Sequence, residues 1–386
     1  MQRTKPTQRT IRLGLAIATA VAAVAATTPS VFAATTGGMH GRGAHHAVFV
    51  QTDNPAGNQV VAYHRAEDGQ LTRTDTYDTG GLGGVLEGSV ADHLASQGSL
   101  TYDERHALLY AVNAGSDTVT VFAVDGDRLV RRQVIASGGR FPVSVAVHGD
   151  AVYVLNALDG GSIQGFVVTD GHLESRADRH RCLGLDPNAT PQFTHTPGQV
   201  GFTGDGSKLV VTTKAGGNSL EVFDLDRSGA PAQSPVVTTQ PDTVPFGFVE
   251  HGEHDILLTQ AGPNAVATVR IHGDGTATQL AAVATGQSAT CWITAAGGFR
   301  YASNAGSSTL SGFRVDEHGR LTPLGNTPTG PGTVDSAASE GGHFLYVQTG
   351  VNGGLDSFRV NTDGSLTALG SETVPDAAGG EGIVAF

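Results

Sequence analysis

The sequence predicts an all-β protein, a seven-bladed β-propeller with four antiparallel strands in each blade. Three observations lead to this fold class. A phrase of four short strands recurs along most of the chain, and a period of this length is typical of propeller blades. Glycine makes up 54 of the 386 residues, and β-branched runs bounded by Gly, Asp and Asn suit strands joined by tight turns. The last residues resemble the missing first strand of the first unit.

The first 33 residues have the features of a secretory signal peptide. A basic start is followed by an alanine-rich apolar run, and small residues precede Ala34, where a signal peptidase would cleave. The apolar run is too short to span a bilayer. We therefore expect a secreted protein exported by the general route, with a flexible mature N-terminus over residues 34–45 and the propeller over residues 46–386.

The charge of the mature chain excludes several classes of partner. Removing residues 1–33 takes away four basic residues and no acidic ones, so that 19 Lys and Arg remain against 36 Asp and Glu, a formal charge of −17. A field of this sign repels nucleic acid and anionic membrane surfaces. We expect a monomer that takes a small-molecule ligand, with no nucleic-acid partner and no membrane association after the signal is removed.

Each repeating unit contains the same four strands in the same order. A strand of small residues such as "VSVAVH" leads through a Gly-Asp turn to an apolar strand such as "AVYVLN". A loop of Ala, Gly and Asn then leads to an alternating strand such as "SIQGFVV", and an Asp-Gly turn leads to a polar fourth strand. Two-residue turns with glycine suit hairpins because their backbone requires positive φ.

Seven units can be counted by their second strands. The spacings between successive second strands are 61, 43, 57, 47, 44 and 45 residues. The two long spacings reflect insertions between a fourth strand and the next first strand. The second strands begin at Ala47, Leu108, Ala151, Lys208, Asp255, Phe299 and Phe344.

The two ends of the propeller region complement each other. The first unit starts at its second strand, near His46, and the chain ends in "GEGIVAF", which looks like a first strand with nothing after it. We predict that Gly382–Phe386 completes the first blade, so that no sheet edge is left open. The alternative is an open sandwich of two domains.

These phrases resemble a known family, the seven-bladed lactonase-type propellers, which include bacterial 6-phosphogluconolactonase and fungal 3-carboxymuconate lactonizing enzyme. The resemblance is carried by "LYAVNAGSDTVTVFAVD", "FPVSVAVHGDAVYVLN", "GQVGFTGDGSKLVVTTK", "VPFGF", "TGQSATCWIT" and "SNAGSSTLSGFRVDEHGRLTPL", and it covers the mature chain. It implies lactone chemistry. Where family members commonly place Pro-His before the first strand of the middle blade, this chain has Pro197-Gly198.

The candidate catalytic residues lie where first strands begin and second strands end, because these loops ring one mouth of a propeller. His195 and Glu381 are candidate bases, Asp335 is a further acid, and Arg140 and Lys214 are candidate cations for a carboxylate or an oxyanion. Structural interpretations remain open for each. His195 could be solvated, Glu381 could bind backbone amides at the closing strand, Asp335 could cap a turn and Arg140 could pair with an acid.

The same positions supply candidate substrate-binding residues. Phe246 and Trp292 could form an apolar wall, although packing between blades would also use them. The asparagines could instead hold the strand-end loops by local hydrogen bonds. The full set of candidate binding residues is Gln199, Phe246, Trp292, Asn113, Asn156 and Asn304.

Other chemistry has no support in the sequence. "GDGSK" sits in a hairpin turn and so is not a phosphate loop, and no zinc-type Cys or His pair is present. We expect no metal and no cofactor. Cys182 and Cys291 lie far apart in the sequence, and we favour two unpaired thiols over a disulfide.

Two functions from different classes remain. The first is an exported lactonase-like propeller that hydrolyses a small lactone or ester at the central funnel. The second is a secreted propeller that binds a small molecule, a glycan or a protein without turnover. A metal-dependent six-bladed lactonase fits less well, because the units number seven and no cluster of acids has calcium-site spacing.

Overall fold

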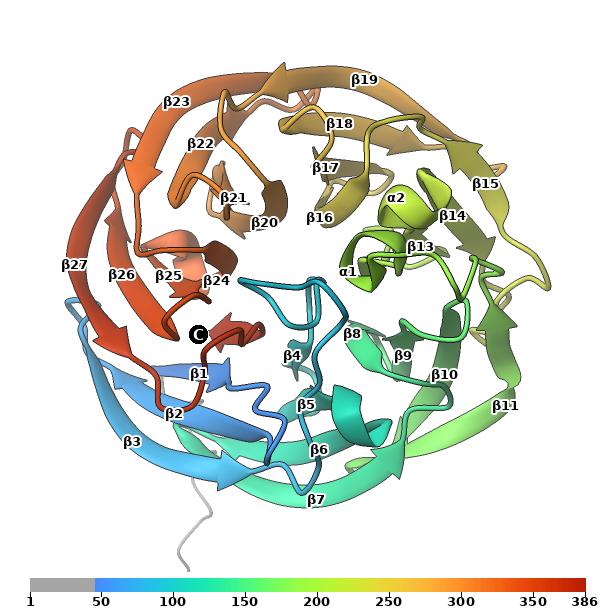
Figure 1. Ribbon diagram of the computed structural model, residues 1–386, viewed down its shortest axis with the longest axis horizontal. Coiled ribbons are helices and arrows are strands. Elements are labelled where there is room, and N and C mark those ends of the chain that lie inside the picture. The colour runs from blue at the N-terminus through green and yellow to red at the C-terminus, as the bar shows by residue number, and fades with distance from the viewer. Residues whose placement is uncertain (1–45) are drawn as a thin grey trace, which may run out of the picture. The chain divides into compact units, whose positions relative to one another are not determined.

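The structure, a computed structural model, describes residues 46–386. These residues form seven four-stranded antiparallel sheets arranged as blades around a common axis (Figure 1). The predicted propeller of seven blades is therefore confirmed. The predictions of a signal peptide and a flexible mature N-terminus concern residues 1–45, which lie outside the described residues.

The blades are numbered in chain order, and the strands of each run from the axis outward. Blade 1 contains β28 (Ile383–Ala385), β1 (Ala47–Gln51), β2 (Gln59–Arg65) and β3 (Leu71–Asp78). Blade 2 contains β4 (Leu100–Asp103), β5 (Leu108–Asn113), β6 (Thr118–Asp125) and β7 (Arg128–Ala136). Blade 3 contains β8 (Pro142–His148), β9 (Ala151–Asn156), β10 (Ser162–Thr169) and β11 (His172–Cys182). Blade 4 contains β12 (Gln199–Phe202), β13 (Lys208–Thr212), β14 (Ser219–Asp224) and β15 (Val236–Thr239). Blade 5 contains β16 (Pro245–His251), β17 (Asp255–Gln260), β18 (Ala265–Ile271) and β19 (Ala277–Ala284). Blade 6 contains β20 (Thr290–Ala296), β21 (Phe299–Asn304), β22 (Thr309–Val315) and β23 (Leu321–Pro328). Blade 7 contains β24 (Thr333–Ala338), β25 (Phe344–Thr349), β26 (Gly354–Val360) and β27 (Leu366–Thr373).

The second strands form the core of the molecule. All seven begin at the residues that the repeat predicted. Every residue of β5, β17 and β25 is buried, because each face of the strand packs against a neighbouring blade. The outermost strands alternate or are mostly exposed, as in β7 and β27. A single blade could not bury both faces, and this explains why the unit is repeated.

Tyrosines of the second strands tie several blades to the next. The Tyr301 hydroxyl in blade 6 donates to the Gly364 carbonyl in the outer hairpin of blade 7, over 2.9 Å. The Tyr346 hydroxyl in blade 7 donates over the same distance to Gly69 in blade 1. The Tyr153 hydroxyl makes the equivalent contact to Gly229 in blade 4. A fully buried phenol thus finds a partner, which it needs in an apolar interior.

The last strand closes the ring as predicted. β28 pairs antiparallel with β1, and the Phe386 N–H and carbonyl exchange hydrogen bonds with Ala47 over 3.0 and 3.1 Å. The Phe386 ring stacks on Tyr102 of blade 2 with 4.4 Å between centroids. Figure 1 shows the red closing strand beside the blue strands of blade 1. The first and last described segments therefore share one sheet.

Inner strands carry a bulge near their first residues in blades 3, 5, 6 and 7. In β20 the pairing shifts at Cys291, between Thr290 and Trp292. A bulge adds an unpaired residue and re-aims its side chain. Phe246, Trp292 and Asp335 were expected just before first strands, and they lie inside them because the strands begin earlier, within or next to these bulges.

Helices are short in the described part of the chain. α1 (Gln192–His195) and α2 (Lys214–Gly217) have four residues each, and two single 3₁₀ turns, Ala114–Ser116 and Glu340–Gly342, complete the set in residues 46–386. None of these helices is long and apolar enough to cross a membrane. Figure 1 shows α1 and α2 side by side over blade 4.

Candidate functional site

The long insertion between β3 and β4, residues 79–99, crosses the axis on the face that carries α1 and α2 (Figure 1). We call it the cap loop. The Gln97 N–H donates to the Gly198 carbonyl at blade 4, and its side-chain amide donates to the Ile293 carbonyl of blade 6 over 3.1 Å and accepts from the Ile293 N–H over 3.0 Å. Gly247 is required beside it, since a Cβ there would lie 2.3 Å from the Gln97 Oε1.

A cavity of about 630 Å³ lies between the cap loop, α1 and the loops of blades 4 to 7. This volume is in the range of small-molecule sites. Most lining residues are apolar, and the ionisable ones are Asp92, Lys214 and Cys291. The wall is completed by Val90, Ala91, Ala95, Phe193, Thr194, Val244, Phe246, Ala261, Gly262, Asn264, Ser288, Ala289, Trp292, Ala305, Gly306 and Val351.

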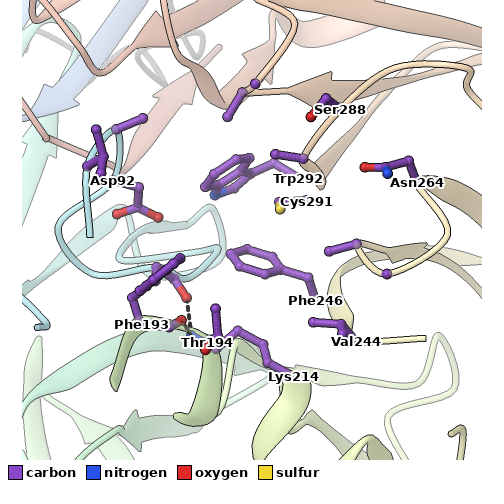
Figure 2. Close-up of a pocket in the computed structure, with 18 of the residues that line it drawn as sticks. Asp92, Phe193, Thr194, Lys214, Val244, Phe246, Asn264, Ser288, Cys291 and Trp292 are labelled. Atoms are coloured by element: carbon purple, nitrogen blue, oxygen red, sulfur yellow. Dashed lines mark hydrogen bonds between the residues drawn. The ribbon is translucent and has the colours of Figure 1, made fainter. Parts of the chain in front are cut away.

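Phe246 and Trp292 form an aromatic wall in this cavity. Their rings meet edge to face, with 5.0 Å between centroids and an interplanar angle of 62°. The Trp292 Nε1 donates to the Ser96 carbonyl of the cap loop over 2.6 Å. The N–H group of the indole is therefore hydrogen-bonded to the cap loop. Figure 2 shows the two rings facing Asp92 across the cavity.

Lys214 is the buried cation of the site, and its exposed fraction is 1%. Its Nζ donates to the Ala95 and Phe193 carbonyls over 2.7 Å each and to the Thr196 Oγ1 over 3.1 Å. The Thr196 hydroxyl donates its proton to the Gln192 carbonyl, so its oxygen must accept the hydrogen bond from Lys214. Burial lowers the pKa of Lys214 to about 7, but these three acceptors require an ammonium with three protons. Lys214 thus fastens α1 to the cap loop.

Asp92 is the carboxylate that lines the cavity. Its Oδ1 accepts from the Leu94 N–H over 2.8 Å, and its Oδ2 accepts from the Ser96 N–H over 2.9 Å. The Ala95 amide is a third backbone donor to this carboxylate, so one of its four lone-pair positions remains for a further donor. Burial raises the pKa of Asp92 to about 6, although these amides and the charge of Lys214 favour the carboxylate. In its carboxylate form the group can accept a proton.

Asp335 and Glu381 form a buried pair of acids close to Asp92. The Glu381 Oε1 accepts from the Gly98 N–H over 3.0 Å, and the Asp335 Oδ1 accepts from its neighbouring Ser336 N–H over 2.9 Å. Burial raises the pKa of Asp335 to about 7 and that of Glu381 well above its usual value. The charge of Asp92 raises both pKa values further, whereas a hydrogen bond with Glu381 lowers the pKa of Asp335. Glu381 thus binds backbone amides next to the closing strand, which was one of its two interpretations.

Four of the five predicted catalytic residues do not line the cavity, namely the buried pair Asp335 and Glu381 together with Arg140 and His195. Arg140 is exposed and lies 3.5 Å from Asp159 in a surface ion pair. His195 ends α1, and its Nδ1 lies 2.9 Å from the Thr194 Oγ1 and 3.0 Å from the Pro191 carbonyl. It faces a separate pocket that is too small for a ligand, about 20 Å³. Of the five candidates, Lys214 is the one that the structure places in the cavity wall.

The predicted binding residues divide in the same way. Phe246 and Trp292 line the cavity, whereas the Gln199 amide bridges to the Phe248 backbone with bonds of 3.1 and 2.6 Å. The three asparagines are buried at strand ends, outside the cavity lining, and they bond to neighbouring strands or loops. Asn113 donates to Thr120 Oγ1, Asn156 donates to the Ser137 carbonyl and Asn304 donates to Ser311 Oγ.

The two cysteines are free, as the sequence favoured. Cys182 is exposed at the end of β11, whereas Cys291 lies at the bulge of β20 and lines the cavity. Burial raises the pKa of the Cys291 thiol to about 12. A thiol with so high a pKa stays protonated at neutral pH, so Cys291 is a poor nucleophile.

Sequence reasoning did not select Asp92. The cap loop was recognised as a long insertion, "GGLGGVLEGSVADHLASQG", and its acids were not considered. The available signal was the insertion itself, because long loops in compact domains are commonly functional. Asn264 and Ser288 were missed as well, and both lie in turns that no strand pattern marks.

Comparisons with known proteins agree with the repeat. The family model for the lactonase, 7-bladed β-propeller family matches residues 84–379. No curated protein sequence matches the chain.

Several solved structures share the fold. A candidate 6-phosphogluconolactonase from Bacteroides fragilis is 18% identical with a TM-score of 0.69, and the alignment covers 87% of this chain and 96% of that one. A Lactobacillus plantarum protein is 18% identical with a TM-score of 0.69, over 88% and 98% of the two chains. A periplasmic gluconolactonase from Pseudomonas aeruginosa is 18% identical with a TM-score of 0.67, over 87% and 98%. At these identities the likeness concerns the fold.

Proposed function

Because the chain belongs to the lactonase family of seven-bladed β-propellers, we propose that it hydrolyses a lactone in the cavity under the cap loop, with Asp92 as the general base. One observation carries the assignment of the site. The cavity brings a buried carboxyl group to an aromatic wall large enough to hold a ring. Two of the solved structures are described as lactonases of sugar acids, which supports the same reaction class.

The reaction needs few groups. Asp92 accepts a proton from a water molecule as the water oxygen bonds to the lactone carbonyl carbon. The ring C–O bond of the tetrahedral adduct then breaks, and the ring oxygen takes the proton back from Asp92, which gives a hydroxy acid and restores the carboxylate. Charge on the carbonyl oxygen grows in the transition state, and the Lys214 ammonium is the positive charge in the cavity wall that would stabilise it through its field.

Export is part of the proposal. The basic and apolar start of the chain supports secretion, and the periplasmic location in the name of the Pseudomonas aeruginosa protein is compatible with it. The compartment is tested by isolating the protein from outside the cell and determining its N-terminal residue. A chain that retains Met1 and stays in the cytoplasm would contradict export.

The test of catalysis is Asp92→Asn, assayed on a lactone panel by pH-stat titration of released acid. The variant should lose about a hundredfold or more in kcat/KM, because a positioned base contributes about that much. The matched control is Asp159→Asn, an exposed aspartate outside the cavity, which should keep wild-type activity. In the wild type, kcat/KM should fall as pH drops through about 6, since the pKa of Asp92 is raised to about 6 by burial.

The pH profile also covers the case in which Asp92→Asn does not fold. A wild-type profile that is flat between pH 5 and 7 would reject Asp92 as the base. If the wild type opens no lactone of the panel, hydrolysis is rejected, and ligand binding without turnover remains.

A further inference from the structure

We propose that the cavity takes an uncharged lactone that carries an apolar substituent, and that phosphorylated sugar lactones are excluded. The proposal rests on the function above, because it names the substrate class of the same site. It is carried by the charges that line the cavity, the aromatic wall and the apolar edge of the mouth.

Within residues 46–386, the lining of the cavity offers no free cation for a phosphate. Among the residues described, the one basic side chain in its lining is Lys214, and all three of its protons are held by Ala95, Phe193 and Thr196. A phosphate could gain a hydrogen bond from Nζ only by breaking one of these. Asp92 in the same cavity would repel a dianion. Phosphate sites are normally built from free guanidinium or ammonium groups.

The walls suit an apolar group instead. The Trp292 indole N–H donates to the cap loop, and the carbon atoms of the ring line the cavity beside the Phe246 ring. Val244, Ala261 and Ala289 continue this surface. Burial of an apolar substituent here is favourable by about 0.8 kcal/mol for each methylene removed from water.

The mouth extends the apolar surface outward. Val90 of the cap loop and Val351 of the β25–β26 turn both line the cavity, and they are 80% and 46% exposed. The cap tip is held against this turn, since a Cβ on Gly350 would lie 1.7 Å from the Ala91 carbonyl. Val90 is the most exposed large hydrophobic residue of the described chain. Covering it with ligand would remove apolar surface from water, so we place the substituent between the aromatic wall and this edge.

Trp292 offers a direct readout, because it is the single tryptophan of the chain and lies in the cavity. The probes are δ-valerolactam and its 6-propyl and 6-pentyl derivatives, which mimic δ-lactones and resist hydrolysis. Fluorescence titration of the wild type should show affinity rising about fourfold for each added methylene until the cavity is filled. 6-Phosphogluconate should neither change the fluorescence nor displace the pentyl lactam.

Charge at the mouth tests the position of the substituent. Val90→Asp and Val351→Asp should each remove most of the gain in affinity that the wild type shows with increasing chain length. Val130→Asp, on the outer strand β7, is the matched control because Val130 is also exposed and lies away from the cavity. It should behave as the wild type.

The outcomes separate this proposal from the proposed function. Lactam binding that grows with chain length, without turnover of any lactone, would support the substrate class and reject catalysis. Hydrolysis of gluconolactone with no dependence on chain length would keep catalysis and overturn the substrate class. Binding of 6-phosphogluconate that is tighter than that of the pentyl lactam, or no binding of any lactam, would also overturn it.

Discussion

Lys214 shows how one side chain can differ from its expected role. As a cation after a second strand it was a candidate for substrate recognition, and it does lie in the cavity wall. Its three hydrogen bonds nevertheless run to the protein and join the cap loop to α1. A buried ammonium is stable only with such partners. Its main contribution is therefore to the shape of the site.

Lys214→Met should loosen the cap loop and α1. Methionine retains the approximate length of the side chain but leaves two buried carbonyls without donors, so we expect a loss of about 2–4 kcal/mol in unfolding free energy. Urea unfolding measures this loss, and limited proteolysis should cut within residues 79–99. Arg140→Met is the control and should change stability by less than about 0.5 kcal/mol, because Arg140 is exposed. Unchanged stability of Lys214→Met would show that the three bonds contribute little.

At the scale of the element, the closing strand has an effect larger than its length. β28 has three residues, yet it supplies the innermost strand of blade 1, and the adjoining Phe386 packs on Phe49 and Tyr102. Without it, blade 1 would present an unpaired edge to the axis. Open edges of this kind favour association with other chains.

Deletion of Gly382–Phe386 should lower the melting temperature by about 10 °C or more and promote aggregation, because it removes the edge pairing and the Phe386 contacts together. Thermal melts and light scattering measure both effects. Phe386→Ala keeps the backbone pairing and should cost less, about 2–4 kcal/mol. A truncated protein that melts within one or two degrees of the full-length chain would contradict the importance of closure.

At the scale of the whole molecule, buried carboxyls near the axis make stability depend on pH. Burial raises the pKa of Asp92 to about 6 and that of Asp335 to about 7, and it raises the pKa of Glu381 well above its usual value. The native state therefore binds more protons than the unfolded state between about pH 4 and 7. Stability must fall as pH rises through this window, whereas the lowered pKa of His93 acts in the opposite direction.

We expect the melting temperature at pH 5 to exceed that at pH 7.5 by about 5 °C or more, because several carboxyls contribute with the same sign. Calorimetry at a series of pH values measures the slope. Glu381→Gln retains an acceptor for the Gly98 N–H and removes one charge, so it should flatten the profile. A melting temperature that rises steadily from pH 5 to 7.5 would contradict this account.

The sequence by itself determined the architecture of this protein. The starts of all seven second strands and the pairing of the C-terminal strand with blade 1 follow from short-range patterns, alternation and glycine turns, repeated often enough to be counted. Such patterns depend on neighbours along the chain. They therefore survive without knowledge of the packing.

The tertiary structure alone decided the site. Asp92 reaches the cavity because the cap loop crosses the axis. The loop is held there by hydrogen bonds to segments far away in sequence, which involve Gln97 of the loop, Trp292 and Lys214. No local pattern states where an irregular loop will fold. His195 lies in a comparable loop and lines a separate, small pocket instead. The repeat fixes where the loops begin, and long-range hydrogen bonds fix which of their side chains meet.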